Sequence, residues 1–515
     1  MPGHESTDSI CFSELWKSAC ILSGNLKHAG LKSGDRAIIM IPMSIDLYIT
    51  LLAIVKTGAI AVFVDPWIPA KRMAKFANFA EPSAFIGIGK SHWLRFMEPD
   101  LRKIDVTVTN GRRFAGFPAK YRLADLKKGT PDWSLASVGP QDPALITFTS
   151  GSSGEPKGAN RTHQFLASQH HALNHEFPYR ESEVDMPMFP IFALNNLVSG
   201  ITSVVPDMDF KKVSDVDGAV IATQMQKHAV TTCTASPPFI DRLCDHVESN
   251  SSPLALRRVL TGGAPVSNQQ LERWQQVFPK TEIVVAYGST EAEPVGHIEA
   301  TERLSLDPNE PGYCTGKISE LVEARVIRIC KTVDDLNGES LARLTLGPNE
   351  IGELVVSGQH VCRDYYRNPQ ATAENKLRDE QGKVWHRMGD TGRLDSQNRF
   401  WLAGRLHSTI VRDSVHLHPQ LIEQMLYLSV NDLVKVAAVG VADESLGQAC
   451  WIVAQVGQSK KQNPETITQI QAQMSQHGFP CDNVELVANP LPVDPRHNSK
   501  IDYDALREQL ESTKA

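Results

Sequence analysis

The chain has 515 residues, which is too long for one hydrophobic core and predicts roughly three units of domain size. Its net charge of -7 gives no case for nucleic acid and suits a protein that handles small molecules. Nine cysteines without any CxxC pair exclude a disulfide framework or a zinc cluster and indicate reduced thiols. The N-terminal sequence is polar, and no apolar run approaches the roughly 18 residues that span a bilayer. We therefore expect a cytoplasmic protein that does not span a membrane.

Residues 37–65 predict a strand, a crossover helix and a second strand. "AIIMI" and "AIAVFVD" are short apolar runs, and the amphipathic segment between them ends at Gly58, a typical helix stop. Such units build parallel sheets. Further buried strands are expected at "PSAFIGIG", "PALITFTS", "TSVVPD", "AVTTCTAS", "RRVLTGG" and "EIVVAYGS". The predicted fold class is α/β with parallel-rich sheets, whose carboxyl strand ends are the places for ligands.

The segment "TFTSGSSGEPKGANRTH", residues 147–163, follows one of these strands and precedes a stretch that is expected to begin a helix. Small donors and one cation are the groups that bind a phosphate. Pro156 supplies no backbone amide, so the segment is not a Walker loop. Taken alone, it is explained equally well as a flexible surface turn. The residues concerned are Thr149, Ser150, Gly151, Ser152, Ser153, Gly154 and Lys157.

The pattern changes from about residue 312 to 403. "ARVIRI", "GELVVSG" and "GRLDSQNRFWLAG" are closely spaced strand patterns, which predict an antiparallel β-barrel subdomain or sheet. After Arg405 the alternation of helix and strand returns and predicts a small α+β domain of about a hundred residues. We expect an N-terminal domain over 1–403 and a C-terminal domain over 404–515.

Five further motifs follow the 149–158 segment in order along the chain: "TGGAP" (261–265), "AYGSTEAE" (286–293), "MGDTGRLD" (388–395), "GRLHSTIV" (404–411) and "RHNSKID" (496–502). With these motifs the chain resembles the AMP-forming adenylating superfamily, which includes acyl-CoA synthetases, adenylation domains and luciferases. Each motif alone has an ordinary structural explanation, but coincidence does not explain six in one order. The resemblance implies ATP and Mg²⁺ as cofactors and a small-molecule acid as substrate.

The resemblance also implies a role for each motif residue. The 149–157 segment is expected to hold phosphates, and Gly262, Gly263 and Ala264 to border the adenine, with Gly263 also at the acyl substrate. Tyr287 is expected to stack on adenine beside Gly288 and Ser289, Thr290 to hold the α-phosphate and Glu291 to bind the metal. Asp390 is expected to accept the ribose hydroxyls, with Arg405 beside a hinge at His407. Lys500 is expected to be the catalytic lysine, brought to the site by a mobile C-terminal domain.

These residue types also suit the reaction itself. When a carboxylate attacks the α-phosphate of ATP, anions come together and charge develops on phosphorus. A bridging cation at Lys500, a metal held by Glu291, and hydroxyl or amide donors on the leaving pyrophosphate would offset that charge.

Two segments depart from the pattern of acyl-CoA synthetases. "MPMFPIFALNN" (186–196) has Pro190 where those enzymes commonly carry a histidine or large aromatic residue. "IVRDS" places Ser414 where they often carry a glycine that lets pantetheine pass. Phe189, Phe192 and Leu194 are expected, with Pro190, to line the acyl pocket. Neutral drift within a working CoA ligase also explains both departures.

The same segments resemble the olefin-biosynthesis β-lactone synthetases, which keep a proline in the first segment and an "RHN.KI" ending. That resemblance implies a β-hydroxy fatty acid whose own hydroxyl attacks the activated carboxyl group. One alternative is an acyl ligase that transfers to CoA or a carrier protein, with CoA as a further cofactor. A second is a non-catalytic nucleotide- or acyl-binding relative. Chain length of the acid, oligomeric state and association with pathway enzymes stay open.

Overall fold

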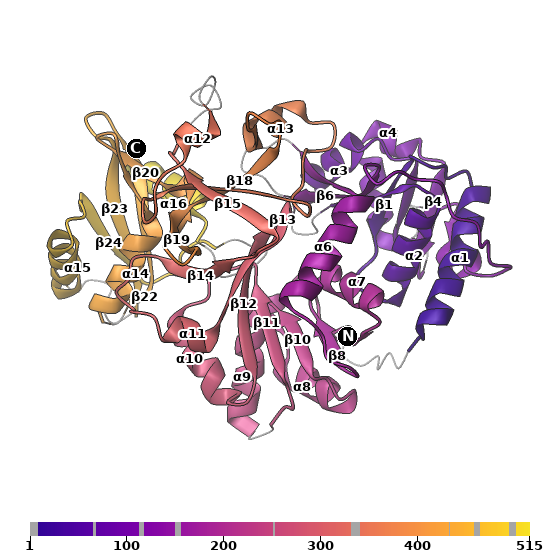
Figure 1. Cartoon of the computed structure of the whole chain (residues 1–515), viewed down its shortest axis with the longest axis horizontal. Helices are drawn as coiled ribbons and strands as arrows, with labels where there is room; N and C mark the ends of the chain where they lie inside the picture. The colour runs from indigo at the N-terminus through magenta and orange to yellow at the C-terminus, as the bar shows by residue number, and fades with distance from the viewer. Residues whose placement is uncertain are drawn as a thin grey trace. The chain divides into compact units, whose positions relative to one another are not determined.

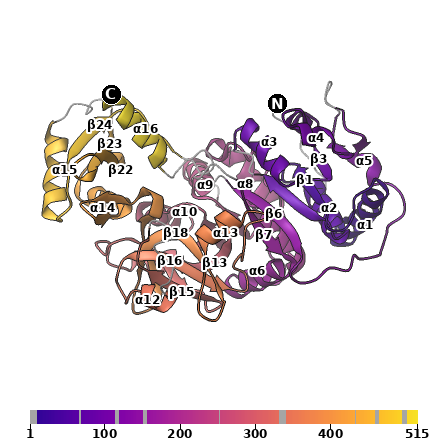
Figure 2. The ribbon, with the colours of Figure 1, turned by 90° about the horizontal axis from the view of Figure 1, so that it is seen from above.

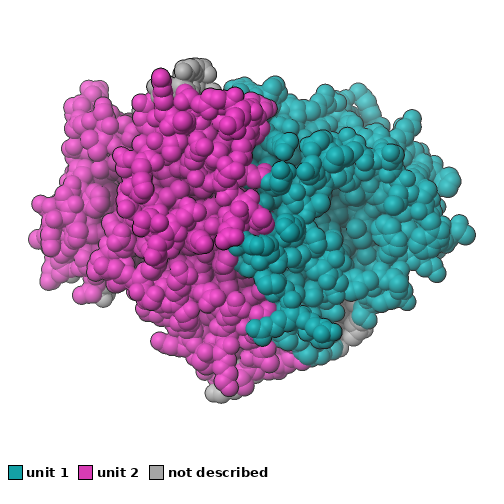
Figure 3. Space-filling view, viewed as in Figure 1, with its two compact units in different colours: residues 1–211, 227–234, 359–373 teal, residues 212–226, 235–358, 374–515 magenta. Residues whose placement is uncertain are grey.

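The computed structural model describes residues 9–64, 68–112, 118–149, 156–250, 253–330, 340–431, 433–457, 464–493 and 501–514. The chain divides into two compact units (Figure 3). Unit 1 comprises Met1–Lys211, Lys227–Thr234 and Gln359–Ala373, and unit 2 comprises Lys212–Gln226, Ala235–Gly358 and Glu374–Ala515. The boundary expected between residues 403 and 404 falls inside unit 2 and stays a prediction.

Unit 1 contains a seven-stranded sheet in the order β5-β4-β3-β1-β2-β6-β7 (Figure 1). The pairings along this order are parallel except that of β6 with β7, which is antiparallel. A second group of parallel strands pairs β8 with β9 and β10. The strands are β1 (Arg36–Met40), β2 (Ile60–Val64), β3 (Ala84–Ile88), β4 (Val106–Asn110), β5 (Tyr121–Arg122), β6 (Pro143–Thr149), β7 (Lys157–Thr162), β8 (Val184–Pro187), β9 (Thr202–Ser203) and β10 (Thr232–Ala235).

The predicted strand–helix–strand unit is confirmed as β1, α2 and β2. The Ser44 hydroxyl accepts a hydrogen bond from the Leu47 amide at the start of α2, and Gly58, at a φ of 74°, ends the turn after it. The helices of this part are α1 (Phe12–His28), α2 (Ile45–Lys56), α3 (Ala70–Phe79), η1 (Gly89–Phe96), α4 (Pro99–Arg102), α5 (Leu123–Leu126), α6 (His163–Glu176) and α7 (Pro190–Ser199).

Two apolar clusters bury the faces of the seven-stranded sheet. One packs Leu22 and Leu26 of α1 with the side chains of α2, and the other packs Phe76 of α3 against Phe85 and Phe148. The predicted α/β class with parallel-rich sheets is confirmed by this layering.

Unit 2 contains strands in the order β15-β16-β18-β19-β14-β13-β12-β11, with β17 on β18. β11 and β12 are parallel, and the remaining pairs are antiparallel, as expected for residues 312–403. These strands are β11 (Arg258–Gly262), β12 (Glu282–Ser289), β13 (Ala292–Glu299), β14 (Tyr313–Ile318), β15 (Val322–Ile327), β16 (Gly352–Gly358), β17 (Lys376–Arg378), β18 (Val384–Leu394) and β19 (Arg399–Arg405).

A smaller sheet forms the C-terminal part of unit 2. β22 (Leu433–Asp443) pairs antiparallel with β23 (Gly447–Val456), which pairs parallel with β24 (Asn483–Val487). Helices α14 and α15 pack on one face of this sheet and α16 on the other (Figure 2). A short hairpin precedes it, made of β20 (Ile410–Arg412) and β21 (Val415–Leu417).

The remaining helices along the chain are η2 (Val213–Asp215), α8 (Gly218–Lys227), α9 (Pro237–Asn250), α10 (Asn268–Val277), α11 (Ala300–Leu304), α12 (Leu341–Leu344), α13 (Pro369–Asn375), η4 (Leu406–Ser408), α14 (Pro419–Ser429), α15 (Pro464–Gln476) and α16 (Tyr503–Lys514).

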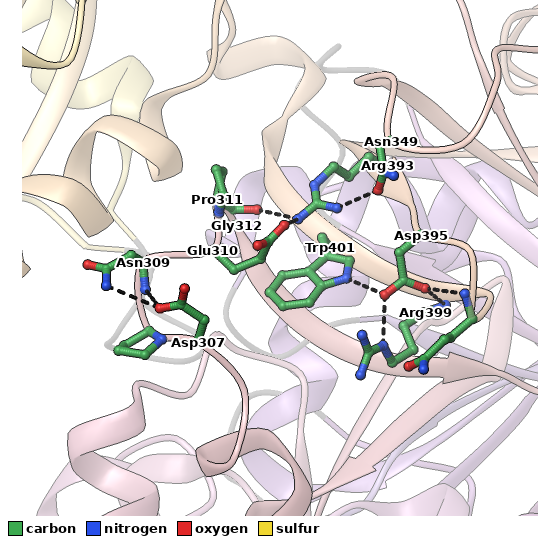
Figure 4. Close-up of polar contacts among 12 residues, drawn as sticks. Asp307, Asn309, Glu310, Pro311, Gly312, Asn349, Arg393, Asp395, Arg399 and Trp401 are labelled. Atoms are coloured by element: carbon green, nitrogen blue, oxygen red, sulfur yellow. Dashed lines mark hydrogen bonds and ion pairs between the residues drawn. The ribbon is translucent and has the colours of Figure 1, made fainter.

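An aromatic and ionic cluster fixes the hairpin between β18 and β19 (Figure 4). The Arg393 guanidinium lies 4.8 Å from the centre of the Trp401 ring, and Trp401 Nε1 donates to Asp395 Oδ2 at 2.9 Å. The same oxygen accepts from Arg399 Nε at 2.7 Å, and Arg393 also pairs with Glu310. A cavity of about 290 Å³ beside this cluster is lined by none of the predicted site residues. The cluster therefore stabilises the two strands that carry Asp390 and Arg405.

Within the described ranges, no helix combines the length and apolar character needed to cross a membrane.

Candidate active site

The predicted phosphate segment joins two strands of unit 1. Thr149, at the end of β6, and Lys157, at the start of β7, are register partners in the antiparallel pair. Residues 150–155 lie outside the described residues; they include Ser150, Gly151, Ser152, Ser153 and Gly154. The expected helix follows the segment as α6, which begins at its last residue, His163, whereas β7 was not predicted and lies within the segment.

The "TGGAP" turn follows β11 and needs its two glycines for different reasons. A Cβ on Gly262 would lie 2.6 Å from the carbonyl oxygen of Ala286 on the neighbouring strand β12. Gly263 has a φ of +77°, which side chains other than glycine rarely adopt. Ala264 continues the turn. The turn thus places exposed backbone beside Ala286, one residue before Tyr287.

The "AYGSTEAE" motif forms the hairpin of β12 and β13. Gly288 lies in an irregular step of the register, and a Cβ there would lie 2.7 Å from the carbonyl oxygen of Ala292. Ser289 pairs with Ala292, so Thr290 and Glu291 form a two-residue turn. Both predicted phosphate- and metal-facing residues therefore stand at the tip of a rigid hairpin.

Tyr287, Asp390 and Arg405 form one hydrogen-bonded group in unit 2. The Tyr287 hydroxyl donates to Asp390 Oδ2 at 2.6 Å, and Arg405 Nη1 donates to Asp390 Oδ1 at 2.7 Å. Asp390 is buried and is the cross-strand partner of Arg405 between β18 and β19. The Tyr287 ring packs 5.6 Å from the ring of Phe400. Each carboxylate oxygen keeps a second lone pair, so Asp390 can still accept from a ribose.

Charges in this group act on one another. Burial, with the added charge of Asp390, raises the pKa of the Tyr287 hydroxyl, which therefore stays protonated and remains a donor. The Asp390 charge raises the pKa of Arg405. The charge of Glu291 also raises the pKa of Arg405, so Glu291 interacts electrostatically with the group formed by Tyr287, Asp390 and Arg405.

Sequence reasoning missed two buried ionisable residues near Glu291. Lys376 on β17 is buried and is the cross-strand partner of His386 on β18. Burial, followed by the charge of Lys376, lowers the pKa of His386 to about 3, while Glu291 acts in the opposite direction. The sequence carries a signal for both residues. In "KLRDEQGKVWHRM", Lys376 and His386 occupy strand positions at which an inward-facing residue is normally apolar.

The predicted acyl residues lie at the start of α7. Phe189 precedes the helix and Pro190 occupies its first position, where the missing amide has no cost. The Pro190 backbone carbonyl accepts from the Tyr48 hydroxyl at 3.2 Å. Phe192 is buried 6.2 Å from the Phe189 ring, whereas Leu194 is half-buried against the core of unit 1.

The predicted hinge lies in η4, where His407 is exposed. The turn between β20 and β21 consists of Asp413 and Ser414, both at positive φ, 48° and 65°. Ser414 therefore occupies a backbone conformation for which glycine is the usual residue. Lys500 lies outside the described residues, which resume at Ile501.

Glu291 fits the proposed role in Mg²⁺ binding. No group of three or more histidine, cysteine, aspartate or glutamate side chains that could hold a metal occurs among the residues described. Mg²⁺ is commonly bound through one or two carboxylates plus substrate phosphates, and it does not require a full protein cage. A single carboxylate at a hairpin tip is such a ligand.

Comparison with known proteins assigns the family. The family model described as "AMP-binding enzyme" matches residues 4–366. The chain belongs to the AMP-binding enzyme family.

This AMP-binding enzyme is 31% identical over 502 residues to "Olefin beta-lactone synthetase" from Stenotrophomonas maltophilia (strain K279a), across 94% of this chain and 88% of the relative. It is 29% identical over 512 residues to the protein of the same name from Xanthomonas campestris pv. campestris, across 97% of this chain and 90% of the relative. The crystal structure of ATP-bound MatB from Rhodopseudomonas palustris superimposes with a TM-score of 0.78 at 20% identity, across 99% and 95% of the two chains. The last similarity shows the shared fold.

The AMP-binding enzyme is therefore an AMP-forming ligase that uses ATP to activate a carboxylic acid. The resemblance to the adenylating superfamily and to β-lactone synthetases is confirmed by these relatives.

Proposed function

We propose that this ligase converts a β-hydroxy fatty acid to a β-lactone in two steps. In the first, an acid oxygen attacks the α-phosphorus of ATP, and pyrophosphate leaves. In the second, the β-hydroxyl oxygen attacks the acyl carbon, the bond from that carbon to the AMP oxygen breaks, and the hydroxyl proton is released. The observation that carries the second step is the similarity to β-lactone synthetases across 94% of this chain.

Residues of the sequence motifs would serve the first step. Thr290 and Lys157 would bind phosphate oxygens, Glu291 would hold Mg²⁺, and Lys500 would bridge the acid and the α-phosphate. A bound Mg²⁺ supplies positive charge that offsets the charge on the phosphates. Tyr287 would face the adenine and Asp390 the ribose.

The second step requires little further apparatus from the protein. A hydroxyl group on the substrate itself is already tethered near the acyl carbon, so no second molecule has to be bound and oriented for the attack. The protein has to fold the chain of the acid and keep water away from the mixed anhydride.

The turn at Ser414 supports a reaction without a thiol. At a φ of 65° a glycine would be favoured, yet the chain carries a side chain there. Pantetheine needs close approach to the backbone in the corresponding stretch of many CoA ligases. A serine at this turn is consistent with a reaction that has no pantetheine arm.

Product analysis tests this function. The protein is incubated with ATP, Mg²⁺ and racemic 3-hydroxy fatty acids, with and without CoA, and products are identified by mass spectrometry. We expect AMP, pyrophosphate and an acyl product lighter than the acid by one water, with no need for CoA. The matched fatty acid without the 3-hydroxyl should give the acyl-adenylate but no such product.

Two other results would overturn the proposal. A thioester formed only with CoA would identify an acyl-CoA ligase. Absence of pyrophosphate release with every acid would identify a binding protein without this activity.

A further inference from the structure

A buried carboxylate links three elements of the C-terminal part of unit 2. Glu423 of α14 is 7% exposed, and its Oε1 accepts from the Ala438 amide of β22 at 3.1 Å. The same oxygen accepts from the Tyr503 hydroxyl, at the start of α16, at 2.7 Å. Helix α14 and α16 are thereby joined through one side-chain atom.

Tyr503 directly follows a neck, formed by residues 492–493 and 501–502, at which the two ends of the segment that carries Lys500 are held together. Val493 and Ile501 form an antiparallel bridge, and the Asp502 amide donates to the Pro492 carbonyl at 3.0 Å. The Asp502 carboxylate accepts from the Ala505 amide in the first turn of α16. Ile501 follows Lys500 directly in sequence, so the position of this neck sets where that segment leaves the domain.

The same helix is fixed to the start of β14, the strand that pairs with β13 of the Thr290–Glu291 hairpin. Gln424, next to Glu423, accepts from the Gly312 amide at 2.8 Å and donates to the Glu310 carbonyl at 3.2 Å. Gly312 immediately precedes β14. One turn of α14 therefore holds the neck beside Ile501 on one side and the start of β14 on the other.

Keeping a carboxylate at this position is costly for stability. A buried polar group loses its hydration, and two donors on a single oxygen recover only part of that free energy. Burial raises the pKa of Glu423 to about 7, while the Tyr503 hydroxyl and the Ala438 amide act to lower it. The groups that face it are Tyr503 of α16, Lys435 of β22, Tyr427 of α14 and Tyr313 of β14. A leucine here would avoid the burial of a carboxyl group but would leave the Tyr503 hydroxyl and the Ala438 amide without this acceptor, so Glu423 and its two donors act as one unit.

We propose that Glu423 and Tyr503 are positioning residues for the adenylation step, because their hydrogen bond anchors the neck from which Lys500 is presented. The inference rests on the proposed role of Lys500 in that step. Neither residue touches the substrate in this role, and both act through the backbone of residues 501–503.

Acid-dependent exchange of labelled pyrophosphate into ATP tests the inference in the full chain. We expect Tyr503→Phe, which removes one oxygen, to lower kcat roughly 10- to 100-fold and leave the KM for ATP within two-fold, because a displaced catalytic group costs rate more than nucleotide binding. Glu423→Gln keeps an acceptor at Oε1 and should retain kcat within about three-fold. Glu423→Met, of similar length but without an acceptor, should match Tyr503→Phe.

Tyr427→Phe is the matched control. Its hydroxyl lies on the same helix and accepts from the Val436 amide at 3.0 Å, and among the described residues it forms no hydrogen bond with residues 501–503. It should leave kcat within two-fold. Amide hydrogen exchange at residues 501–505 should accelerate in Tyr503→Phe and Glu423→Met and stay unchanged in Tyr427→Phe.

The outcomes separate this inference from the proposed function. If the wild-type protein shows no exchange with any acid, the proposed function fails. If the wild type exchanges pyrophosphate and Tyr503→Phe keeps kcat within two-fold, or Tyr427→Phe loses as much, the positioning role is refuted.

Discussion

Asp390 shows how one buried side chain connects several strands. Its two oxygens accept from Tyr287 and Arg405, which reach it from different strands of unit 2. Burial of the Tyr287 hydroxyl, with the added charge of Asp390, raises the pKa of Tyr287 and keeps it protonated, and the Asp390 charge raises the pKa of Arg405. A nucleotide that used this carboxylate would meet a group whose orientation is already fixed.

Asp390→Asn should weaken ATP binding about 10- to 100-fold, because hydrogen bonds to a charged group contribute about 1.5–3 kcal/mol. Isothermal titration calorimetry with ATP measures this loss. Asp395→Asn is the control, since Asp395 lies in the same hairpin but serves Trp401 and Arg399. An unchanged Kd in Asp390→Asn would remove this residue from the nucleotide site.

At the residue scale, the structure explains why three positions of the motifs are glycine. Gly262, Gly263 and Gly288 were found from their motifs, and each occupies a position where a Cβ would clash or φ is positive. The Tyr287–Asp390 hydrogen bond could not be predicted, because 103 residues separate the partners and strand pairing brings them together. Glu423 was also missed, since a glutamate within "LIEQML" is normally assigned to the solvent face of the helix.

At the scale of elements, two short turns determine which residues lie at the ends of the strands and in which backbone conformation. The two-residue turn at Thr290 and Glu291 fixes both side chains by the pairing of Ser289 with Ala292. The hairpin of β20 and β21 has the same length, but Asp413 and Ser414 sit there at positive φ. Two-residue hairpins favour such backbone angles, and they are unfavourable for side chains other than glycine and asparagine.

Ser414→Gly should therefore stabilise the protein by about 0.5–1 kcal/mol, since relief of the left-handed conformation exceeds the added entropy of the unfolded chain. Thermal denaturation of both proteins measures the change. Ser445→Gly, in the loop between β22 and β23, is a control, because Ser445 does not have a positive φ and its hydroxyl binds Asp443. A lower melting temperature in Ser414→Gly would contradict this interpretation of the turn.

Element prediction succeeded where periodicity was clear and failed where a polar segment was paired. The unit of β1, α2 and β2 followed from apolar spacing and the stop at Gly58. "KGANRT" has no such spacing, yet it forms β7 because it pairs with β6 and is held by residues 364–368. Tertiary contacts decided that segment.

At the scale of the whole molecule, ionisation of Glu423 contributes to the dependence of stability on pH. Its pKa rises from an ordinary value of 4.5 to about 7 on folding, so the folded protein holds a proton that the unfolded chain releases. The stabilisation of the folded protein by this proton is complete below pH 4.5 and is lost as pH rises to about 7.

Glu423→Gln resembles the protonated form at every pH. Relative to this variant, the wild-type protein should lose about 3 kcal/mol of stability between pH 4.5 and pH 8, at roughly 1.4 kcal/mol per pKa unit. Calorimetric melting temperatures of both proteins at pH 5 and pH 8 test this difference. Equal differences at the two pH values would show that Glu423 does not titrate in this range.

The cross-strand partnership of Asp390 with Arg405 has a thermodynamic consequence. Arg405 is the last residue of β19, directly before the chain enters η4 and its C-terminal part. If a ribose takes a share of the Asp390 oxygens, the ion pair at the entrance to that part weakens or shifts, and the free energy of nucleotide binding then includes that change. By reciprocity, if bound ATP changes the affinity of this part for a second ligand, that ligand must change the affinity for ATP by the same factor.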